Sequence, residues 1–263
     1  MSKNIAVIFA GGVGSRMGTN DLPKQFLSIE DKPIIIHTIE IFEEHPEIDE
    51  IYVACLEEWI GHLMNLLKLH SIKKVKEVFP GGETPLHSIY NALIKIKENT
   101  NADDTVVLLH DGVRPYLDYS VITDNITGVK EHGNAITTTP SFETVLISED
   151  GDKVTSVPLR KNMFAGQAPQ SFLLGELLDA HEQIRKTKPN YEEIVDSCTM
   201  YHLLGKPVHM VRGNFGNIKV TTERDYYILL GLLEYARSGD FNELVDEQKK
   251  EIQKTFKPYR KRY

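Results

Sequence analysis

The chain has 263 residues, of which 41% are hydrophobic and 26% charged, and its net charge is −8. This length can bury a substantial core, as one large domain or two small ones. The negative charge argues against nucleic-acid binding by the main body, and the longest apolar runs are too short to span a bilayer.

Strands and helices are predicted to alternate through the first half of the chain. Apolar runs predict strands at residues 5–10, 50–56, 75–79 and 104–110, and helical patterns follow at 34–45, 57–70, 86–94 and 119–132. The third helix has apolar residues at the spacing of one helix face: Leu86, Ile89, Tyr90, Leu93 and Ile94. This alternation indicates a mainly parallel sheet with helices on both faces.

The pattern changes between about residues 134 and 160. The β-type segments 135–140, 143–148 and 153–159 follow one another without a helix, and EDGD at 149–152 is a turn signal. Since the sheet does not need such a hairpin, we expect a β-arm over about residues 139–160 that projects and finds a partner. The remaining predictions are helices at 174–186 and 192–204, strands at 207–211 and 218–221, and a helix at 222–237.

No internal repeat or linker divides the chain, so residues 1–238 are predicted to form a single α/β domain with a Rossmann-like sheet. Residues 239–263 are predicted to be a basic C-terminal extension. The segment 249–263 carries seven Lys or Arg and one Glu, which leaves the rest of the chain at −14. It is either a solvated extension or a contact with an acidic partner, subunit or lipid surface.

The expected location is the cytoplasm. No secretory leader follows the opening MSKN, because the apolar run behind it is typical of a buried strand. Cys55 and Cys198 lie far apart and lack metal-ligand spacing, which fits a reducing compartment.

Ligands of such sheets bind beyond the carboxyl ends of the strands. The first loop there, FAGGVGSRMGTNDLPKQF at 9–26, holds four glycines. It lacks the Lys-Ser/Thr pair of a Walker A loop, and Met17 stands where a dinucleotide fingerprint needs its third glycine. Its backbone N–H groups can surround an anion, with Arg16 and Lys24 spaced to lie along one phosphate chain. The alternative is a flexible surface turn with two solvated cations.

Two further loops carry charged residues at predicted strand ends. In HDGVRPY at 110–116, Asp111 is a natural Mg²⁺ ligand beside a polyphosphate, because Mg²⁺ prefers a carboxylate together with phosphate oxygens. The alternative is that Asp111 caps its own loop and pairs with Arg114. In NIKVT at 217–221, Lys219 stands between apolar neighbours, a pattern that also fits an ordinary edge-strand lysine.

Five motifs occur in a characteristic order: AGGVGSRM…LPKQF, GGETPLHS, HDGVRP, QAPQSF and NIKVTT. In this order they resemble the cytidylyltransferases that activate polyol phosphates, a family that includes 2-C-methyl-D-erythritol 4-phosphate and ribitol-5-phosphate enzymes. The resemblance runs from about residue 5 to 235. It implies that CTP and a polyol phosphate react to give a CDP-polyol and pyrophosphate.

The resemblance also implies roles for individual residues. The loop of Ala10, Gly11, Gly12 and Gly14 would wrap the triphosphate, Arg16 and Lys24 would bind its oxygens, Lys219 would neutralise the α-phosphate, and Mg²⁺ on Asp111 would bridge phosphates. Gly82, Glu83 and Ser88 would read the cytosine edge, Thr144 and Arg160 on the arm would contact the acceptor across a homodimer, and Arg114 and Asp196 would lie near the site.

Four positions depart from the family pattern. Gly216 replaces an acidic residue, Glu143 an aspartate and Ala168 a threonine on the acceptor side, while Pro85 replaces an arginine. FAGQAPQSF is closer to the ribitol type, so ribitol 5-phosphate or a related open-chain sugar-alcohol phosphate is favoured, in teichoic acid or capsule synthesis.

Three alternatives remain open. The chain could be the methylerythritol enzyme, a nucleotidyltransferase that uses another nucleoside triphosphate, or a non-catalytic nucleotide-binding partner of a polymer-synthesis complex.

Overall fold

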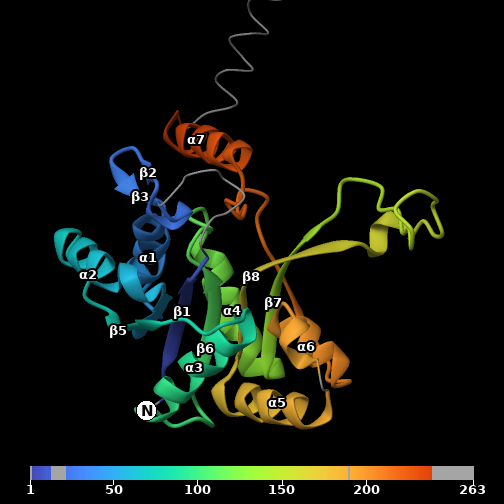
Figure 1. The fold of residues 1–263 in the computed structure, drawn as a ribbon, viewed down its shortest axis with the longest axis horizontal. Helices are drawn as coiled ribbons and strands as arrows, with labels where there is room; N and C mark the ends of the chain where they lie inside the picture. Colours follow the sequence, from blue (N-terminus) through green and yellow to red (C-terminus); the bar gives the residue numbers. More distant parts are fainter. Residues whose placement is uncertain (1, 13–21, 189, 239–263) are drawn as a thin grey trace, which may run out of the picture.

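A computed structural model describes residues 2–12, 22–188 and 190–238. Its centre is a seven-stranded sheet in the order β5-β4-β1-β6-β8-β7-β9 (Figure 1). Strands β5, β4, β1 and β6 are parallel, β8 runs antiparallel to both of its neighbours, and β9 is parallel to β7. The predicted α/β class, with a mainly parallel sheet, is confirmed.

The parallel half of the sheet forms from the apolar runs that predicted it. Its strands are β1 (Asn4–Ala10), β4 (Glu50–Cys55), β5 (Val75–Pro80) and β6 (Val106–Asp111). Successive side chains of a strand point to opposite faces. In β1, Ile5 and Val7 accordingly enter one core while Ala6 and Ile8 enter the other.

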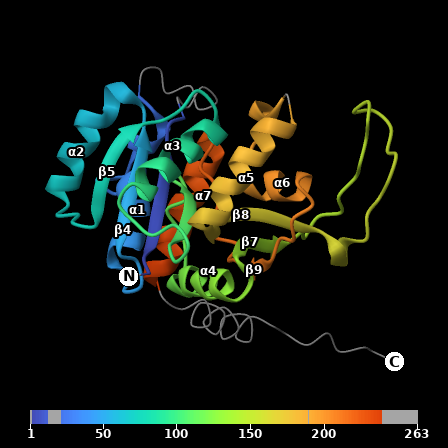
Figure 2. The ribbon, with the colours of Figure 1, turned by 90° about the horizontal axis from the view of Figure 1, so that it is seen from below.

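Helices cover both faces of this sheet (Figures 1 and 2). One face is covered by α1 (Ile34–Glu44), α2 (Ile60–Leu69) and α4 (Tyr119–His132). The other is covered by α3 (Pro85–Lys97), α5 (Leu174–Thr187) and α6 (Ser197–Leu203). Both faces are thereby buried, as the near-continuous apolar strands require.

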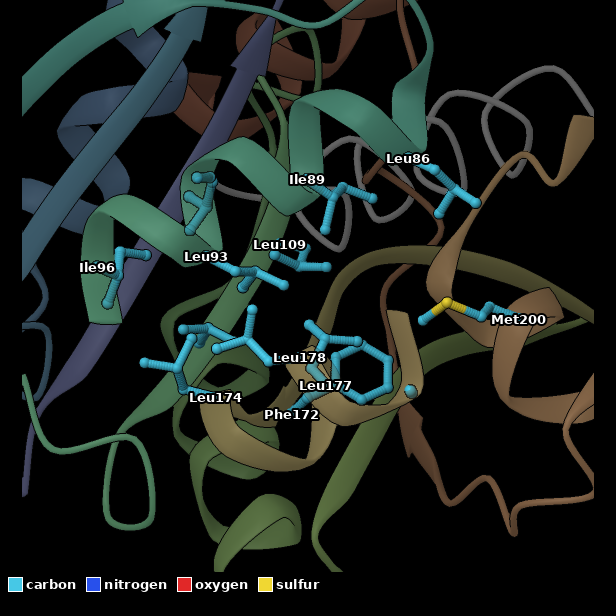
Figure 3. Close-up of a cluster of buried hydrophobic side chains, with 14 of the residues drawn as sticks. Leu86, Ile89, Leu93, Ile96, Leu109, Phe172, Leu174, Leu177, Leu178 and Met200 are labelled. Carbon is cyan, nitrogen blue, oxygen red and sulfur yellow. The ribbon is translucent and has the colours of Figure 1, made fainter. Parts of the chain in front are cut away.

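The predicted apolar face of α3 packs into the second of these layers. Figure 3 shows Leu86, Ile89, Leu93 and Ile96 on one side of the helix, directed at apolar side chains of β6, β8 and α5. The last of them lies beyond the predicted end of the helix at residue 94, because α3 continues to Lys97. Tyr90 and Ile94 are only partly buried and lie at the edge of the face.

Two predicted helices are interrupted. The segment 57–70 divides into the 3₁₀ turn η3 (Glu57–Trp59) and α2, and the segment 192–204 into the turn η5 (Tyr191–Glu193) and α6. The second break has a clear cause. The side chain of Asp196 accepts a hydrogen bond from the Thr199 N–H and so starts a new helix at Ser197.

The second half of the sheet differs from the prediction. β7 (Asn134–Pro140) and β9 (Met210–Arg212) were expected, but the ten-residue strand β8 (Phe164–Leu173) between β6 and β7 was not. The predicted strand at 218–221 is wrong, because this segment has no regular secondary structure. There the backbone pairs through the Val220 N–H, which donates to Val113 O at 2.9 Å.

Residues 141–163, between β7 and β8, project from the body as an arm (Figure 2). The predicted β-hairpin is not formed along its length, since a single bridge joins Ile147 to Ser156. The arm has no sheet to pack on within this chain, and strands need such packing to form. The predicted turn is present, with Gly151 at a φ of +77° and three residues bonded to the Asp150 carboxylate.

A third, smaller core lies below α7 (Glu223–Ser238), which packs beside the short strands β2 (Ser28–Ile29) and β3 (Lys32–Pro33). It joins Ile29 and Leu229 with Val113 and Val220, and so fixes the segment that follows β6. Over the described ranges, none of the helices has the length and apolar character that a membrane span requires.

Candidate active site

A cleft of about 690 Å³ opens at the carboxyl ends of β1, β4, β5 and β6. It contains eleven of the residues that the sequence predicted for the site: Ala10, Gly11, Gly12, Lys24, Gly82, Glu83, Ser88, Asp111, Arg114, Asp196 and Lys219. Parallel strands end at the same edge of a sheet, which is why loops far apart in sequence converge here. Gly14 and Arg16 lie outside the described residues.

Lys24 lies beside Gly12, the last described residue of the glycine loop. It belongs to the 3₁₀ turn η2 (Lys24–Phe26) and is only 9% exposed. Its Cε is 3.9 Å from the position that a Cβ on Gly12 would take. The neighbouring Gln25 donates from Nε2 to Ala10 O at 2.6 Å, which ties this turn to the end of β1. The loop backbone and the lysine therefore face the same part of the cleft.

Asp111 ends β6 and is held by two cations. Its Oδ1 accepts from Lys219 Nζ at 2.7 Å and its Oδ2 from Arg114 Nε at 2.8 Å. Burial alone would raise the pKa of Asp111, but the charges of Lys219 and Arg114 outweigh it and lower the pKa to about 2. The carboxylate is therefore ionised throughout the physiological range. The predicted pairing of Asp111 with Arg114 is therefore present. Asp111 also lines the cleft, where the prediction of a metal ligand requires it to be.

His110 supports the turn that carries Arg114. Its ring is buried, and Nε2 lies 3.1 Å from Arg114 O. Burial disfavours the imidazolium form and lowers the pKa of His110 to about 4. A histidine that is neutral at pH 7 adds no charge beside Asp111, so its part in this turn is structural.

The loop after β5 is closed tightly onto the start of α3. The Gly82 N–H donates to Ser88 Oγ at 2.9 Å, and Thr84 caps the helix by accepting from the His87 N–H at 3.2 Å. A Cβ on Gly82 would lie 2.5 Å from His87 Cβ, so a larger residue does not fit this path. Pro85, one of the departures from the family pattern, occupies the first helical turn, where proline is favoured.

Asp196 lines the cleft with its carboxylate already bonded. Oδ1 caps α6, and Oδ2 accepts from Gln170 Nε2 at 3.1 Å. Gln170 also accepts from the Cys198 N–H at 3.1 Å and so joins β8 to α6. Gln170 was not predicted as a site residue, although it lies in the motif QAPQSF.

Thr144 and Arg160 are not brought to the cleft within one chain. Both lie exposed on the arm, and Arg160 Nη1 donates to Phe142 O at 3.2 Å.

Asn217, a second residue that was not predicted, holds the segment before Lys219. Asn217 is fully buried and donates to Ala168 O at 2.6 Å. Its position in the motif NIKVT is the one sequence signal that marked it.

The Gly216 departure has a steric explanation in this fold. A Cβ on Gly216 would lie 2.5 Å from Cδ1 and 2.6 Å from Cε1 of the Tyr116 ring. The tyrosine therefore fills the space that a side chain at position 216 would need. The acidic residue of the related pattern cannot be accommodated here unless Tyr116 moves.

Comparison with known proteins identifies the family of this chain. The family model for 2-C-methyl-D-erythritol 4-phosphate cytidylyltransferase (IspD) matches residues 4–233. The chain belongs to this family. It is a cytidylyltransferase, and the sequence-based assignment is confirmed.

Curated relatives of this family member include ribitol-5-phosphate cytidylyltransferases. That of Vibrio parahaemolyticus serotype O3:K6 is 46% identical over 231 residues, which cover 88% of this chain and 96% of the relative. That of Streptococcus agalactiae serotype III is 41% identical and covers 88% of this chain and 95% of the relative.

Solved structures share its fold. The 2-C-methyl-D-erythritol 4-phosphate cytidylyltransferase of Francisella tularensis has a TM-score of 0.70 at 29% identity and covers 90% of this chain and 99% of its own. The 4-diphosphocytidyl-2C-methyl-D-erythritol synthase of Anaerococcus prevotii reaches a TM-score of 0.76 at 22% identity, with 89% and 99% coverage.

Proposed function

We propose that this family member makes CDP-ribitol and pyrophosphate from CTP and D-ribitol 5-phosphate. The observation that carries the choice of acceptor is the 46% identity to a ribitol-5-phosphate cytidylyltransferase over nearly the whole of both chains. The methylerythritol enzyme is the second candidate, favoured by the family model. The two solved methylerythritol structures described above are 22% and 29% identical to this chain, which is why ribitol 5-phosphate is preferred.

The cleft supplies what this reaction requires. A phosphate oxygen of the acceptor attacks the α-phosphorus of CTP, the bond to the β-phosphate oxygen breaks, and pyrophosphate leaves. No protein nucleophile is needed, so catalysis consists of positioning two anions and stabilising charge at the α-phosphate. Lys24 beside Gly12, and Lys219, whose Nζ contacts Asp111 at the end of β6, are the proposed cations for this task, with Arg16 as a third.

The remaining parts of the cleft are assigned to the nucleotide and the acceptor. We place the triphosphate on the loop that runs from Ala10 through Gly11 and Gly12 to Gly14, and cytosine at Gly82, Glu83 and Ser88. Arg114 holds Asp111, and Asp196 shapes the wall near the acceptor through its bonds to Gln170 and α6.

Asp111 is the proposed ligand of Mg²⁺. No cluster of three or more His, Cys, Asp or Glu side chains in the described part of the chain could hold a metal by itself. A single ionised carboxylate nevertheless fits, because Mg²⁺ bound to nucleotides takes one or two carboxylates and completes its shell with phosphate oxygens and water. When bound, Mg²⁺ would supply charge neutralisation between phosphates.

The arm is proposed to form a homodimer in which Thr144 and Arg160 reach the partner's acceptor site. Six large apolar side chains of the arm are exposed: Phe142, Leu146, Ile147, Val154, Val157 and Leu159. Phe164, the first residue of β8, is exposed as well. An exposed apolar surface of this extent is typical of an interface. Three other expectations stay predictions. They are a single catalytic domain over residues 1–238, a basic extension over 239–263, and a cytoplasmic role in surface-polymer synthesis.

Pyrophosphate release tests the function directly. We expect release with CTP and ribitol 5-phosphate, weak release with 2-C-methyl-D-erythritol 4-phosphate, and none when CTP is replaced by ATP, GTP or UTP. Activity with the methylerythritol substrate alone would establish the second candidate. A response to GTP alone would reject the cytidylyl assignment for this member, and CTP binding without turnover on any polyol phosphate would indicate a non-catalytic partner.

Mixed dimers test the sharing of sites. A Lys24→Ala subunit and an Arg160→Ala subunit are each expected to be inactive as homodimers. In the mixed dimer, one site pairs an intact Lys24 with an intact partner Arg160, so partial activity should return. Mixed dimers that are verified by differential tags and stay inactive would contradict an arm that works across the interface.

A further inference from the structure

Lys219 lies on backbone that has no strand to hold it. Its side chain is 45% exposed, yet Nζ lies 2.7 Å from Asp111 Oδ1. The segment 213–221 is irregular. After Lys219 it is held by Val220, which is buried in the small core and whose N–H donates to Val113 O, so the stretch before Lys219 needs an anchor of its own. A lysine with several rotatable bonds needs a defined backbone position to keep this contact.

Asn217, two residues before Lys219, joins this segment to the sheet. Its side chain is completely buried. Nδ2 donates to Ala168 O at 2.6 Å and approaches Gln167 Oε1 at 3.4 Å, so both acceptors belong to β8. A buried amide in this position replaces the ladder bonds that a strand would have supplied.

The main chain of Asn217 is also part of the charged group in the cleft. Its carbonyl oxygen accepts from Arg114 Nη1 at 2.7 Å, and Arg114 Nε donates to Asp111 Oδ2 at 2.8 Å. Asp111 in turn holds Lys219. These contacts form a closed loop that runs from the Asn217 carbonyl through Arg114 and Asp111 to Lys219. The loop is completed by the backbone between Asn217 and Lys219.

The segment is held from its other side as well. Gln167 Nε2 donates to Asn214 O at 3.1 Å, and the Gly213 N–H donates to Thr138 O at 2.7 Å. Position 216 lies against the Tyr116 ring, with room for glycine only. The backbone that leads to Lys219 is therefore fixed by side chains of β8 and of the loop after β6.

We propose that Asn217 is the positioning residue for Lys219, acting through its bond to Ala168 O. The inference rests on the proposed function, in which Lys219 supplies charge at the α-phosphate. Asn217 does not contact the reacting atoms. It sets where the Lys219 ammonium lies relative to Asp111. The sequence had assigned no role to this residue of the motif NIKVT.

The Asn217→Asp substitution removes the Nδ2 donor and keeps the shape of the side chain. A carboxylate oxygen would face Ala168 O at the place of the 2.6 Å hydrogen bond, and the two acceptors repel. A misplacement of about 1 Å can cost roughly 100-fold in rate. We expect a fall in kcat of that order, with the CTP dissociation constant within about threefold of the wild type because Lys24 and the glycine loop are untouched.

Asn65→Asp is the matched control. It is the same substitution at an exposed position of α2, and Asn65 does not line the cleft. We expect kcat within about twofold of the wild type. Gln167→Ala serves as a milder second variant if Asn217→Asp does not fold, since it removes one of the two acceptors and should lower kcat in the same direction.

A double-mutant cycle separates positioning from a general structural loss. If Asn217 acts through Lys219, adding Asn217→Asp to Lys219→Ala should lower kcat no further. Equal losses in both backgrounds would overturn the proposal.

Acetylation of Lys219 by acetic anhydride, followed by peptide mass spectrometry, gives a readout that needs no acceptor. Release from Asp111 should speed labelling severalfold in Asn217→Asp, and labelling should be unchanged in Asn65→Asp. Unchanged labelling in Asn217→Asp would overturn the positioning role. Failure of the wild type to use ribitol 5-phosphate would instead count against the proposed function alone.

Discussion

Replacing Asp111 by asparagine should destabilise the protein in a pH-dependent manner. The change keeps the shape of the side chain and removes the negative charge that Lys219 and Arg114 share. Burial opposes this charge, the two cations favour it, and the net effect lowers the pKa of Asp111 from 3.8 to about 2. A carboxyl group whose pKa is lower in the folded state stabilises the protein wherever it is ionised.

The size of the effect follows from the displacement of the pKa. One pH unit is worth about 1.4 kcal/mol, so the shift from 3.8 to about 2 corresponds to about 2.4 kcal/mol. The Asp111 side chain is 26% exposed, and we therefore expect about 2 kcal/mol in the free energy of unfolding at pH 7. The stabilisation is fully present above about pH 5, and roughly half of it is lost by pH 3 as the pH falls toward the folded pKa.

Urea unfolding at 25 °C, at a fixed protein concentration, measures the difference between wild type and Asp111→Asn at pH 7, 5, 4 and 3. Asp124→Asn is the matched control, because Asp124 is exposed on α4 and should change the free energy of unfolding by less than about 0.5 kcal/mol. A difference near zero at pH 7, or one that stays constant down to pH 3, would refute the reasoning about the shared charge.

Three further predictions concern activity. Lys24→Ala and Lys219→Ala should each lower kcat about 100-fold or more, measured by pyrophosphate release, and a loss confined to KM would place that lysine outside the transition state. Gly82→Ala should raise the KM for CTP at least tenfold, since its Cβ would lie 2.8 Å from the His87 backbone carbon; an unchanged KM would remove this loop from the nucleotide site. Gly216→Asp should be impaired by the Tyr116 ring and regain activity with Tyr116→Gly, whereas a fully active single variant would disprove the steric conflict.

The parallel half of the fold could be predicted because its signals are local. Each buried strand is a short run of Ile, Val and Leu followed by a helical pattern, and both faces of the sheet need apolar cover. The cleft followed from the same prediction. Once Ala10, Pro80 and Asp111 end parallel strands, their loops must meet, and Lys24 and Asp111 were found in one cleft for that reason.

Strand β8 could not be predicted because its sequence contradicts the ordinary rules for a central strand. It contains Gly166 and Pro169, and proline cannot donate to a ladder. The structure accommodates Pro169 at an irregularity: the register with β7 shifts between Ile136 and Thr138, and Thr137 Oγ1 donates to Pro169 O at 2.7 Å. Such compensation comes from residues about 30 positions away and leaves no local pattern.

In the arm and in the segment 218–221, strands were predicted that do not form. Their β-branched residues have the composition of strands, but β-propensity expresses packing against neighbours. Val154 and Val157 have no sheet to pack on and stay exposed, while Val220 is buried against α7 and Val113 with few ladder bonds. Composition alone cannot distinguish a strand from an extended segment that another element buries.

The arm and the catalytic segment are joined physically, which links the two parts of the proposed function. Phe142, at the root of the arm, packs on Phe215 with ring centroids 4.4 Å apart. Phe215 is two residues before Asn217, and Arg160 Nη1 donates to Phe142 O. A partner subunit that covers these exposed rings would therefore bury the start of the segment that carries Lys219. The proposed dimer and the proposed placement of Lys219 would then depend on the same short stretch of chain, so an acceptor site shared between subunits is compatible with a lysine anchored by Asn217.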